Sequence, residues 1–188
     1  MQAFDFDNTI YKGESSYDFA IFVMKHNPKL FKYLPGIIRI LLLYKVKRMD
    51  AQEFLTMVNN YNKPFLENKD EIIRLTKKFW ETHEKNLYLN MLEKIHFNDV
   101  IITAAPDFLI NGIKDRLNTK HILCTKTDLK KGTIEYLNFG SNKVKLFKEK
   151  YPHKTIKNFY TDSYNDTPFM NFSLNVYLVS HGDSKKIK

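Results

Sequence analysis

The chain has 188 residues, of which 43% are hydrophobic, and carries 30 Lys and Arg against 21 Asp and Glu, a net charge of +9. This length suits one domain, or a core with a subdomain, and excludes neither an enzyme nor a binding module. The surplus of positive charge allows attraction to nucleic acid, to an anionic membrane or to a phosphorylated substrate, and the scattered lysines select none of them. The single cysteine, Cys124, excludes an intramolecular disulfide and a cysteine metal cluster and is expected in the core.

The hydrophobic stretches predict no membrane span. Asp5 comes before any apolar segment of the kind found in a signal peptide, so none is expected. The most hydrophobic stretch, residues 34–46, includes Arg39 and Lys45 and is too short to cross a bilayer. We therefore expect a cytoplasmic protein.

Residues 2–6 predict a short strand that runs into the acidic sequence Asp5-Phe6-Asp7-Asn8-Thr9. Side chains two residues apart in an extended chain project to the same side, so Asp5 and Asp7 should lie together. Two neighbouring carboxylates repel each other and need a proton or a cation, and Mg²⁺ suits them because it prefers oxygen ligands. Taken alone, these residues fit a surface turn equally well.

Residues 15–95 have apolar side chains at helical spacing, which predicts a helical subdomain of at least four helices. Asp50 followed by Glu53 predicts a capping box for a helix over 51–61, and Lys63-Pro64 is expected to interrupt the chain after it. Another helix is expected over residues 70–86.

The stretch 29–48 is both apolar and basic. It could lie on an anionic membrane, contact a partner such as a second copy of the chain, or pack inside the helical subdomain.

From residue 100 onward, short β-branched runs alternate with helical patterns. Strands are predicted over 100–103, 122–124, 133–136, 156–161 and 174–179, and helices over 106–117, 142–151 and 165–172. Such alternation predicts an α/β fold, a Rossmann-like three-layer core with a parallel sheet, plus an inserted helical-bundle cap. The expected core is 1–12 and 97–188, the expected cap is 13–96, and the tail from Asp183 is expected to fray.

Three predicted strands end in residues with oxygen-bearing side chains, Asp5, Thr103 and Asp162. Ligands of parallel α/β sheets bind at the carboxyl ends of the strands, so these side chains should meet at one edge. That convergence favours a site over a turn.

The motifs resemble those of the haloacid dehalogenase-like (HAD) superfamily. Asp5 to Thr9 matches its first motif, DxDxT, and Thr103 matches the strand-terminal Ser or Thr of the second. Lys143, after Gly140-Ser141-Asn142, matches the third, and Asp162-Ser163-Tyr164-Asn165-Asp166 matches the acidic fourth. The resemblance covers nearly the whole chain in the expected order.

The resemblance implies a Mg²⁺-dependent phosphatase acting on a small phosphomonoester. Asp5 would be the nucleophile that forms an aspartyl-phosphate, and Asp7 the acid and base. Thr103 would bind a phosphate oxygen, and Lys143 would balance the charge of Asp5 and the phosphate. Lys145 competes with Lys143 for the last role.

The same resemblance implies a metal site. The carboxylates of Asp5 and Asp162 and the backbone carbonyl of Asp7 would hold Mg²⁺. Asp166 would bind the ion directly or through water, and it also fits a helix N-cap before Pro168.

The spacing of the motifs is similar to that of the phosphoserine-phosphatase-like branch, subfamily IB. A long interval between Thr9 and Thr103 has room for a helical cap, whereas the interval from Thr103 to Lys143 is too short for a second large one.

The candidate substrate contacts are Thr9, Glu14, Ala104 and Arg48. Glu14 lies where a glutamate reads the substrate amino group in phosphoserine phosphatases, and Arg48 or Arg39 could meet a carboxylate. The sequence departs from those enzymes at Thr103-Ala104-Ala105, where they have glycines that let the backbone approach the substrate. Phosphoserine is therefore one candidate substrate among several, a nucleotide included.

The alternative from another functional class is a binding protein. It would have the same fold without catalysis and would bind nucleic acid or an anionic membrane through its basic surface. Binding of nucleic acid is not expected, because converging carboxylates would repel a polyanion.

Overall fold

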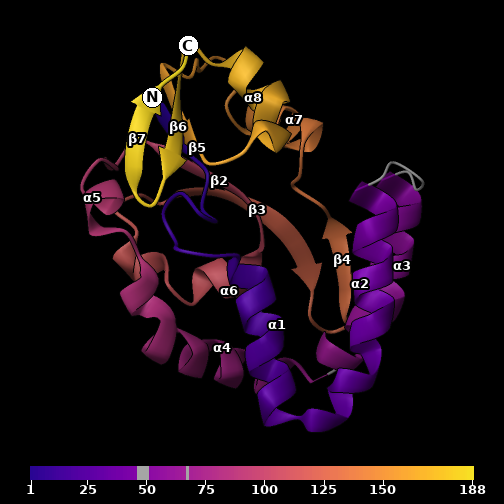
Figure 1. Ribbon diagram of the computed structural model, residues 1–188. Coiled ribbons are helices and arrows are strands. Elements are labelled where there is room, and N and C mark those ends of the chain that lie inside the picture. The colour runs from indigo at the N-terminus through magenta and orange to yellow at the C-terminus, as the bar shows by residue number, and fades with distance from the viewer. Residues whose placement is uncertain (46–50, 67) are drawn as a thin grey trace.

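The structure is a computed structural model that describes residues 1–45, 51–66 and 68–188. Its centre is a seven-stranded sheet in the order β4-β3-β2-β1-β5-β6-β7 (Figure 1). The strands are β1 (Gln2–Phe4), β2 (Val100–Pro106), β3 (His121–Asp128), β4 (Thr133–Tyr136), β5 (Asn158–Thr161), β6 (Asn175–Ser180) and β7 (Asp183–Lys186). The five inner strands are parallel, and the edge strands β4 and β7 are antiparallel to their neighbours.

Helices fill most of the connections between the strands, while short turns join β3 to β4 and β6 to β7. They are α1 (Ser15–His26), α2 (Leu34–Lys45), α3 (Ala51–Leu66), α4 (Lys69–His83), α5 (Leu89–Leu92), α6 (Asp107–Asn111), α7 (Ser141–Lys150) and α8 (Thr167–Phe172). Short 3₁₀ helices are η1 (Pro28–Tyr33), η2 (Glu84–Asn86), η3 (Lys114–Arg116) and η4 (Tyr164–Asp166).

The sheet is the middle of three layers, which confirms the predicted α/β core. Successive residues of a strand point to opposite faces. Ala3 of β1 packs with Val100 and Ile102 into the cluster formed with α7 and α8. Phe4 and Ile101 belong instead to the cluster formed with α1, α4 and α6. Strands that are apolar on both faces are typical of a parallel sheet covered by helices.

Two of the helices between β1 and β2 pack as part of the core. Phe19 of α1 and Phe79 of α4 are buried together with Phe4 in one cluster. Trp80 Nε1 donates a hydrogen bond of 2.8 Å to the carbonyl of Leu109 in α6. The stretch 13–96 is thus divided. Helices α1 and α4 pack on the sheet, whereas α2 and α3 form a small cluster around Ile40 and Phe54 and join the main cluster through Leu66. We propose that the cap is limited to the α2–α3 pair.

The α2–α3 pair stands beside strand β4 (Figure 1). Gly36 of α2 lies so close to the ring of Tyr61 on α3 that a side chain at residue 36 would clash with it. Asn59 of α3 bonds the backbone of β4 in both directions. Its Nδ2 donates to Ile134 O at 3.1 Å, and its Oδ1 accepts from Ile134 N at 2.7 Å. These two bonds attach the helical pair to the edge of the sheet.

Three local predictions were wrong. Helix α3 continues through Pro64 to Leu66, because the amphipathic packing of its last turn outweighs the lost hydrogen bond. The helix after Pro106 ends at Asn111, and η3 replaces the rest. The tail does not fray, because Asp183–Lys186 pairs with β6 as β7 and Lys188 Nζ donates to the carbonyl of Ser173 at 2.7 Å.

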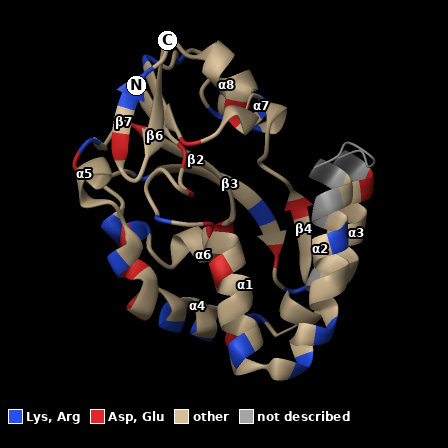
Figure 2. Cartoon of the chain, in the orientation of Figure 1, with Lys and Arg blue, Asp and Glu red and all other residues tan. Residues whose placement is uncertain are grey.

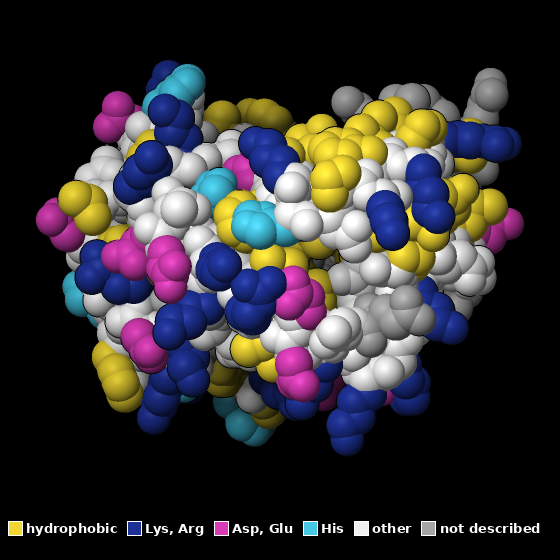
Figure 3. Space-filling model, turned by 90° about the horizontal axis from the view of Figure 1, so that it is seen from below, with side chains coloured by type: hydrophobic (Ala, Val, Ile, Leu, Met, Phe, Trp, Pro, Cys, Tyr) yellow, Lys and Arg dark blue, Asp and Glu magenta, His cyan; other side chains and the backbone are white. Residues whose placement is uncertain are grey.

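Asp50, the first residue of the predicted capping box, lies outside the described residues. So do residues 46–48 of the apolar, basic stretch 29–48. Within the rest of that stretch Ile38 is exposed and Ile40 is buried. Hydrophobic side chains gather on the side of the molecule formed by α2 and α3 (Figure 3). Among the described residues no helix is both long and apolar enough to cross a membrane.

Lys and Arg are distributed over helices and strands on several sides of the molecule (Figure 2). Cys124 is buried in the core as predicted, and burial raises the pKa of its thiol to about 11.

We expect Phe79→Ala to lower the free energy of unfolding by about 3–5 kcal/mol, because it removes a fully buried ring between α1, α4 and the sheet. Urea unfolding followed by circular dichroism measures this loss. The matched control on the same helix is Ile73→Ala, whose side chain is half exposed and whose loss should be about 0.5 kcal/mol. Equal losses at the two positions would contradict the packing described above.

Candidate active site

A tight loop after β1 places the first two acidic side chains. The carbonyl of Phe6 accepts hydrogen bonds from the N–H groups of Ile10 at 2.8 Å and Tyr11 at 2.9 Å. Asn8 has a φ of 53°, in the left-handed region that Asn tolerates better than most residues. Its backbone N–H donates to Gly13 O at 3.0 Å, and its Oδ1 accepts from Gly13 N at 3.1 Å. Asn8 thereby closes the loop that carries Asp5 and Asp7.

Lys143 joins three separate parts of the chain. It follows Gly140, whose φ of 55° turns the chain into α7, and its side chain is almost completely buried. Its Nζ donates to Asp5 Oδ1 at 2.8 Å and lies 2.8 Å from Asp166. Lys145 is exposed on the same helix. The structure therefore brings Lys143, and not Lys145, to the acidic cluster.

Burial sets the protonation of this cluster. Burial raises the pKa of Asp5, the nearby charges of Asp166 and Asp7 raise it further, and Lys143 opposes them. Burial alone would lower the pKa of Lys143, but the carboxylates of Asp5 and Asp166 hold it above its usual range. The ammonium group therefore stays charged, and it is the only Lys or Arg that the structure buries among the described residues.

Asp7 is held at the start of α1. Its Oδ1 accepts a hydrogen bond of 2.7 Å from the backbone N–H of Ser15. Burial raises the pKa of Asp7 to about 6, although the bonds from Ser15 and the charge of Lys143 act in the opposite direction. A carboxyl group that titrates near neutrality can both give and take a proton, as an acid–base catalyst must.

Thr103 lies at the same edge of the sheet and is fully buried. Its Oγ1 accepts a hydrogen bond of 3.0 Å from Ala105 N, so its own proton can be donated to a ligand. Asn138, in the segment between β4 and α7, supports this position. Its Nδ2 donates to Thr103 O at 3.0 Å and to Leu123 O at 2.9 Å.

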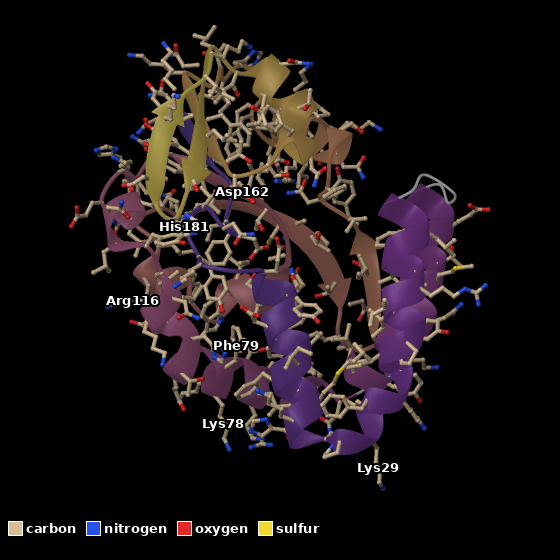
Figure 4. The ribbon with its side chains drawn as sticks, in the orientation of Figure 1. Lys29, Lys78, Phe79, Arg116, Asp162 and His181 are labelled. Carbon is tan, nitrogen blue, oxygen red and sulfur yellow. The ribbon has the colours of Figure 1, made fainter. Side chains whose placement is uncertain are left out.

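The two acidic residues of the last motif have different surroundings. Asp162 follows β5 beside the loop that carries Asp5 (Figure 4), and burial raises its pKa. Asp166 is buried, and it accepts hydrogen bonds from Lys143 and, at 3.0 Å, from Thr161 Oγ1. Asp166 is therefore engaged in positioning Lys143, and a metal contact through water suits it better than direct ligation.

The donor chemistry fits a hard divalent cation. Asp5, Asp7, Asp162 and Asp166 place four carboxyl groups around the single ammonium of Lys143. Burial raises the pKa values of the first three, and neighbouring carboxylates add to the rise, so a bound cation would favour their ionised forms. Among the described residues no three Asp, Glu, His or Cys side chains form a complete metal site. A Mg²⁺ ion needs fewer side chains, because it completes its shell with carbonyl oxygen, water and phosphate.

The predicted substrate contacts have different outcomes. Glu14 is exposed at the edge of the site, where Asn8 Nδ2 donates to it at 2.9 Å. Partial burial and the charges of Asp7 and Asp162 raise its pKa to about 7. Ala104 lines a cavity together with Glu14. Arg48 lies outside the described residues.

Thr9 lies in the loop after β1, two residues beyond Asp7. Its side chain is fully buried, and its hydroxyl has no hydrogen-bond partner among the described residues. A contact between Thr9 and a substrate stays a prediction.

The family model of the haloacid dehalogenase-like hydrolases matches residues 3–171. The chain belongs to this family. Its motifs are thus those of a HAD hydrolase, and they lie at the carboxyl edge of the sheet, where the order of strands and helices predicted that these side chains would meet. No curated protein sequence matches the chain significantly.

Solved structures show the same fold at low sequence identity. A protein of unknown function from Bordetella pertussis Tohama I has a TM-score of 0.75 at 16% identity, covering 91% of this chain and 85% of that one. A phosphoserine phosphohydrolase-like protein from Francisella tularensis has a TM-score of 0.60 at 18% identity, covering 94% and 86%. A substrate-bound phosphoserine phosphatase has a TM-score of 0.57 at 14% identity, covering 93% and 82%.

Four residues that support the site of this HAD hydrolase were not assigned a role from the sequence. They are Asn8, Ser15, Asn138 and Thr161. Asn8 alone had a signal, since Asn is one of the few residues that tolerate a left-handed turn. Ser15 and Thr161 bond acidic residues that lie 8 and 5 positions away. Asn138 bonds the carbonyls of Thr103 and Leu123 across 35 and 15 positions. No local pattern in the sequence marks any of these contacts.

We expect Lys143→Met to lower the free energy of unfolding by about 3–5 kcal/mol at neutral pH, because it leaves Asp5 and Asp166 buried without their shared cation. Urea unfolding in metal-free buffer measures the loss. The matched control is Lys145→Met, two residues along the same helix, where the change should stay within about 0.5 kcal/mol. A Lys143→Met protein as stable as the control would show that the buried ion pairs do not form.

Proposed function

We propose that this HAD hydrolase is a Mg²⁺-dependent phosphatase that cleaves a phosphomonoester through an aspartyl-phosphate on Asp5. The observation that carries the proposal is the buried contact of Lys143 with Asp5, next to an Asp7 whose pKa is about 6. This arrangement supplies a fixed nucleophile, a fixed positive charge and a proton donor in one place. The phosphoserine phosphatases among the structures of similar fold are consistent with it.

The reaction follows from the positions of these groups. An oxygen of Asp5 attacks phosphorus, the bond to the leaving oxygen breaks, and Asp7 transfers its proton to that oxygen. In the second half, Asp7 takes a proton from water, the water oxygen attacks phosphorus, and the bond to Asp5 breaks to release phosphate. A pKa of about 6 lets Asp7 act in both directions near neutral pH.

The remaining groups stabilise charge. Lys143 Nζ balances the negative charge that Asp5 and the phosphate share, and Thr103 donates its proton to a phosphate oxygen. The carboxylates of Asp5 and Asp162 and the carbonyl of Asp7 would hold Mg²⁺, which supplies further positive charge to the phosphoryl group. Asp166 fixes Lys143.

Two alternative functions fit the site less well. A non-catalytic binder of polyanions gains nothing from four clustered carboxyl groups. The Lys and Arg seen in Figure 2 lie on helices and strands in several parts of the molecule. Phosphoserine as the substrate would require a cation for its carboxylate. Arg39 is exposed on α2, and Arg48 is not described.

We expect the wild-type protein to hydrolyse 4-nitrophenyl phosphate with Mg²⁺, and Asp5→Asn to reduce kcat by at least about 10³-fold, since it removes the nucleophile. Release of nitrophenol measures the rate. Asp115→Asn, on η3 away from the site, is the control and should leave the rate unchanged. Equal rates in wild type and Asp5→Asn would refute the proposed nucleophile.

We expect EDTA to abolish the activity and Mg²⁺ to restore it, while Ca²⁺ restores little because its larger shell suits the site less well. The thermal unfolding temperature should also rise with Mg²⁺ concentration, since a ligand that binds only the folded state stabilises it. Hydrolysis that persists in EDTA, with no Mg²⁺-dependent stabilisation, would exclude the metal.

A further inference from the structure

A deep cavity adjoins the catalytic residues. It has a volume of about 460 Å³ and lies between α1, the α2–α3 pair and the strands β2, β3 and β4. Its lining includes Ala104, the residue after Thr103, and Glu14, the residue before α1. The volume is within the range of sites for small ligands. Because it begins beside Thr103, the cavity lies where the part of a substrate beyond its phosphate must go.

The lining of this cavity is almost entirely hydrocarbon. The apolar lining residues include Phe19 and Ala20 of α1, Phe54 and Val58 of α3, and Phe108 and Leu137 on the side of the sheet. The polar side chains that line it are Glu14, Ser16, Tyr17, Thr125 and Thr127. Among the described residues no Lys, Arg or His lines it.

The walls are held in place on both sides. Asn59 bonds the backbone of Ile134, a lining residue of β4, in both directions. On the opposite side the rings of Phe19 and Phe108 pack against each other with their centres 5.6 Å apart. The cavity is therefore a built space rather than a gap between loose helices.

From this geometry we propose that the preferred substrate is a phosphomonoester whose leaving group carries a bulky hydrocarbon body, aliphatic or aromatic, that fills the cavity. The inference rests on the proposed phosphatase function and names its substrate class. Burial of hydrocarbon against these walls is favourable, and the contact is made by the leaving group before and during bond cleavage.

The same lining disfavours a small charged leaving group such as that of phosphoserine. An ammonium and a carboxylate placed among Phe19, Val58 and Leu137 would lose their hydration, and only Glu14 offers a charged partner. The described lining has no cation for the carboxylate. Apolar substrates should therefore be preferred over phosphoserine.

The test is a series of ethyl, butyl, hexyl and octyl phosphate, with 1-naphthyl phosphate as the aromatic arm and phosphoserine as the polar one. We expect kcat/KM to rise about threefold to fourfold for each methylene that enters the cavity, and phosphoserine to be slower than hexyl phosphate. The ratio of naphthyl to octyl phosphate separates an aromatic from an aliphatic preference.

Two variants locate the effect. Ala20→Phe and Val58→Phe add a ring from opposite walls and should lower kcat/KM for octyl phosphate at least about tenfold, while ethyl phosphate loses far less. The control is Met57→Phe, the exposed neighbour of Val58 on α3, which should leave the whole series unchanged. Two narrowing variants on different helices keep the test valid if one of them fails to fold.

Binding of alkylphosphonates, which cannot be hydrolysed, separates the two proposals. If hydrolysis fails for every phosphate but calorimetry shows affinity that rises with chain length and falls in Ala20→Phe, the phosphatase proposal is wrong and the apolar binding cavity stands. If aryl and alkyl phosphates are hydrolysed without any dependence on chain length, or phosphoserine is the best substrate, the phosphatase proposal stands and this inference is overturned. Absence of both hydrolysis and binding overturns both.

Discussion

The contact of the Lys143 ammonium with Asp5 and Asp166 is the constraint on which the site depends. It joins residues that are 138 and 23 positions apart, in three different connections of the sheet. A charge removed from water is costly unless it is paired, so neither carboxylate could be buried at this edge without the lysine, and the lysine could not be buried without them. The loop after β1, the start of α7 and the turn before α8 must therefore pack together for the chain to fold with these groups inside.

Next to this charged centre lies a region of opposite character. Glu14 and Ala104 mark the boundary, since each adjoins the catalytic residues and also lines the apolar cavity. The phosphate would be recognised on one side by charge and hydrogen bonds, and the leaving group on the other side by hydrocarbon contact. The groups that would cleave the phosphate are then separate from those that would select the leaving group. Residues of α1 and α3 can change without moving Asp5, Asp7 or Lys143.

The fold and the charged half of the site could be predicted from the sequence, because strand-terminal acids and helical periodicity are local patterns. The predicted parallel core, the predicted strands over 122–124 and 133–136 and the expected pairing of Lys143 with Asp5 all agree with the structure. The prediction that the tail frays was wrong because Asp183–Lys186 pairs through its backbone alone and shows no apolar pattern. The cavity could not be predicted from the sequence, since its walls come from seven elements and no single stretch of sequence describes a space between them.

The double hydrogen bond of Asn59 to Ile134 has a mechanical consequence. A helical pair tethered in this way cannot swing away as an independent lid, because the movement would either break both bonds or pull β4 from β3, its neighbour in the sheet. Any movement of these helices would therefore have to carry β4 with them as one arm. Release of a bulky alcohol would then be limited by how often that arm flexes as a whole, and a change at residue 59 would alter turnover without touching any group that contacts phosphorus.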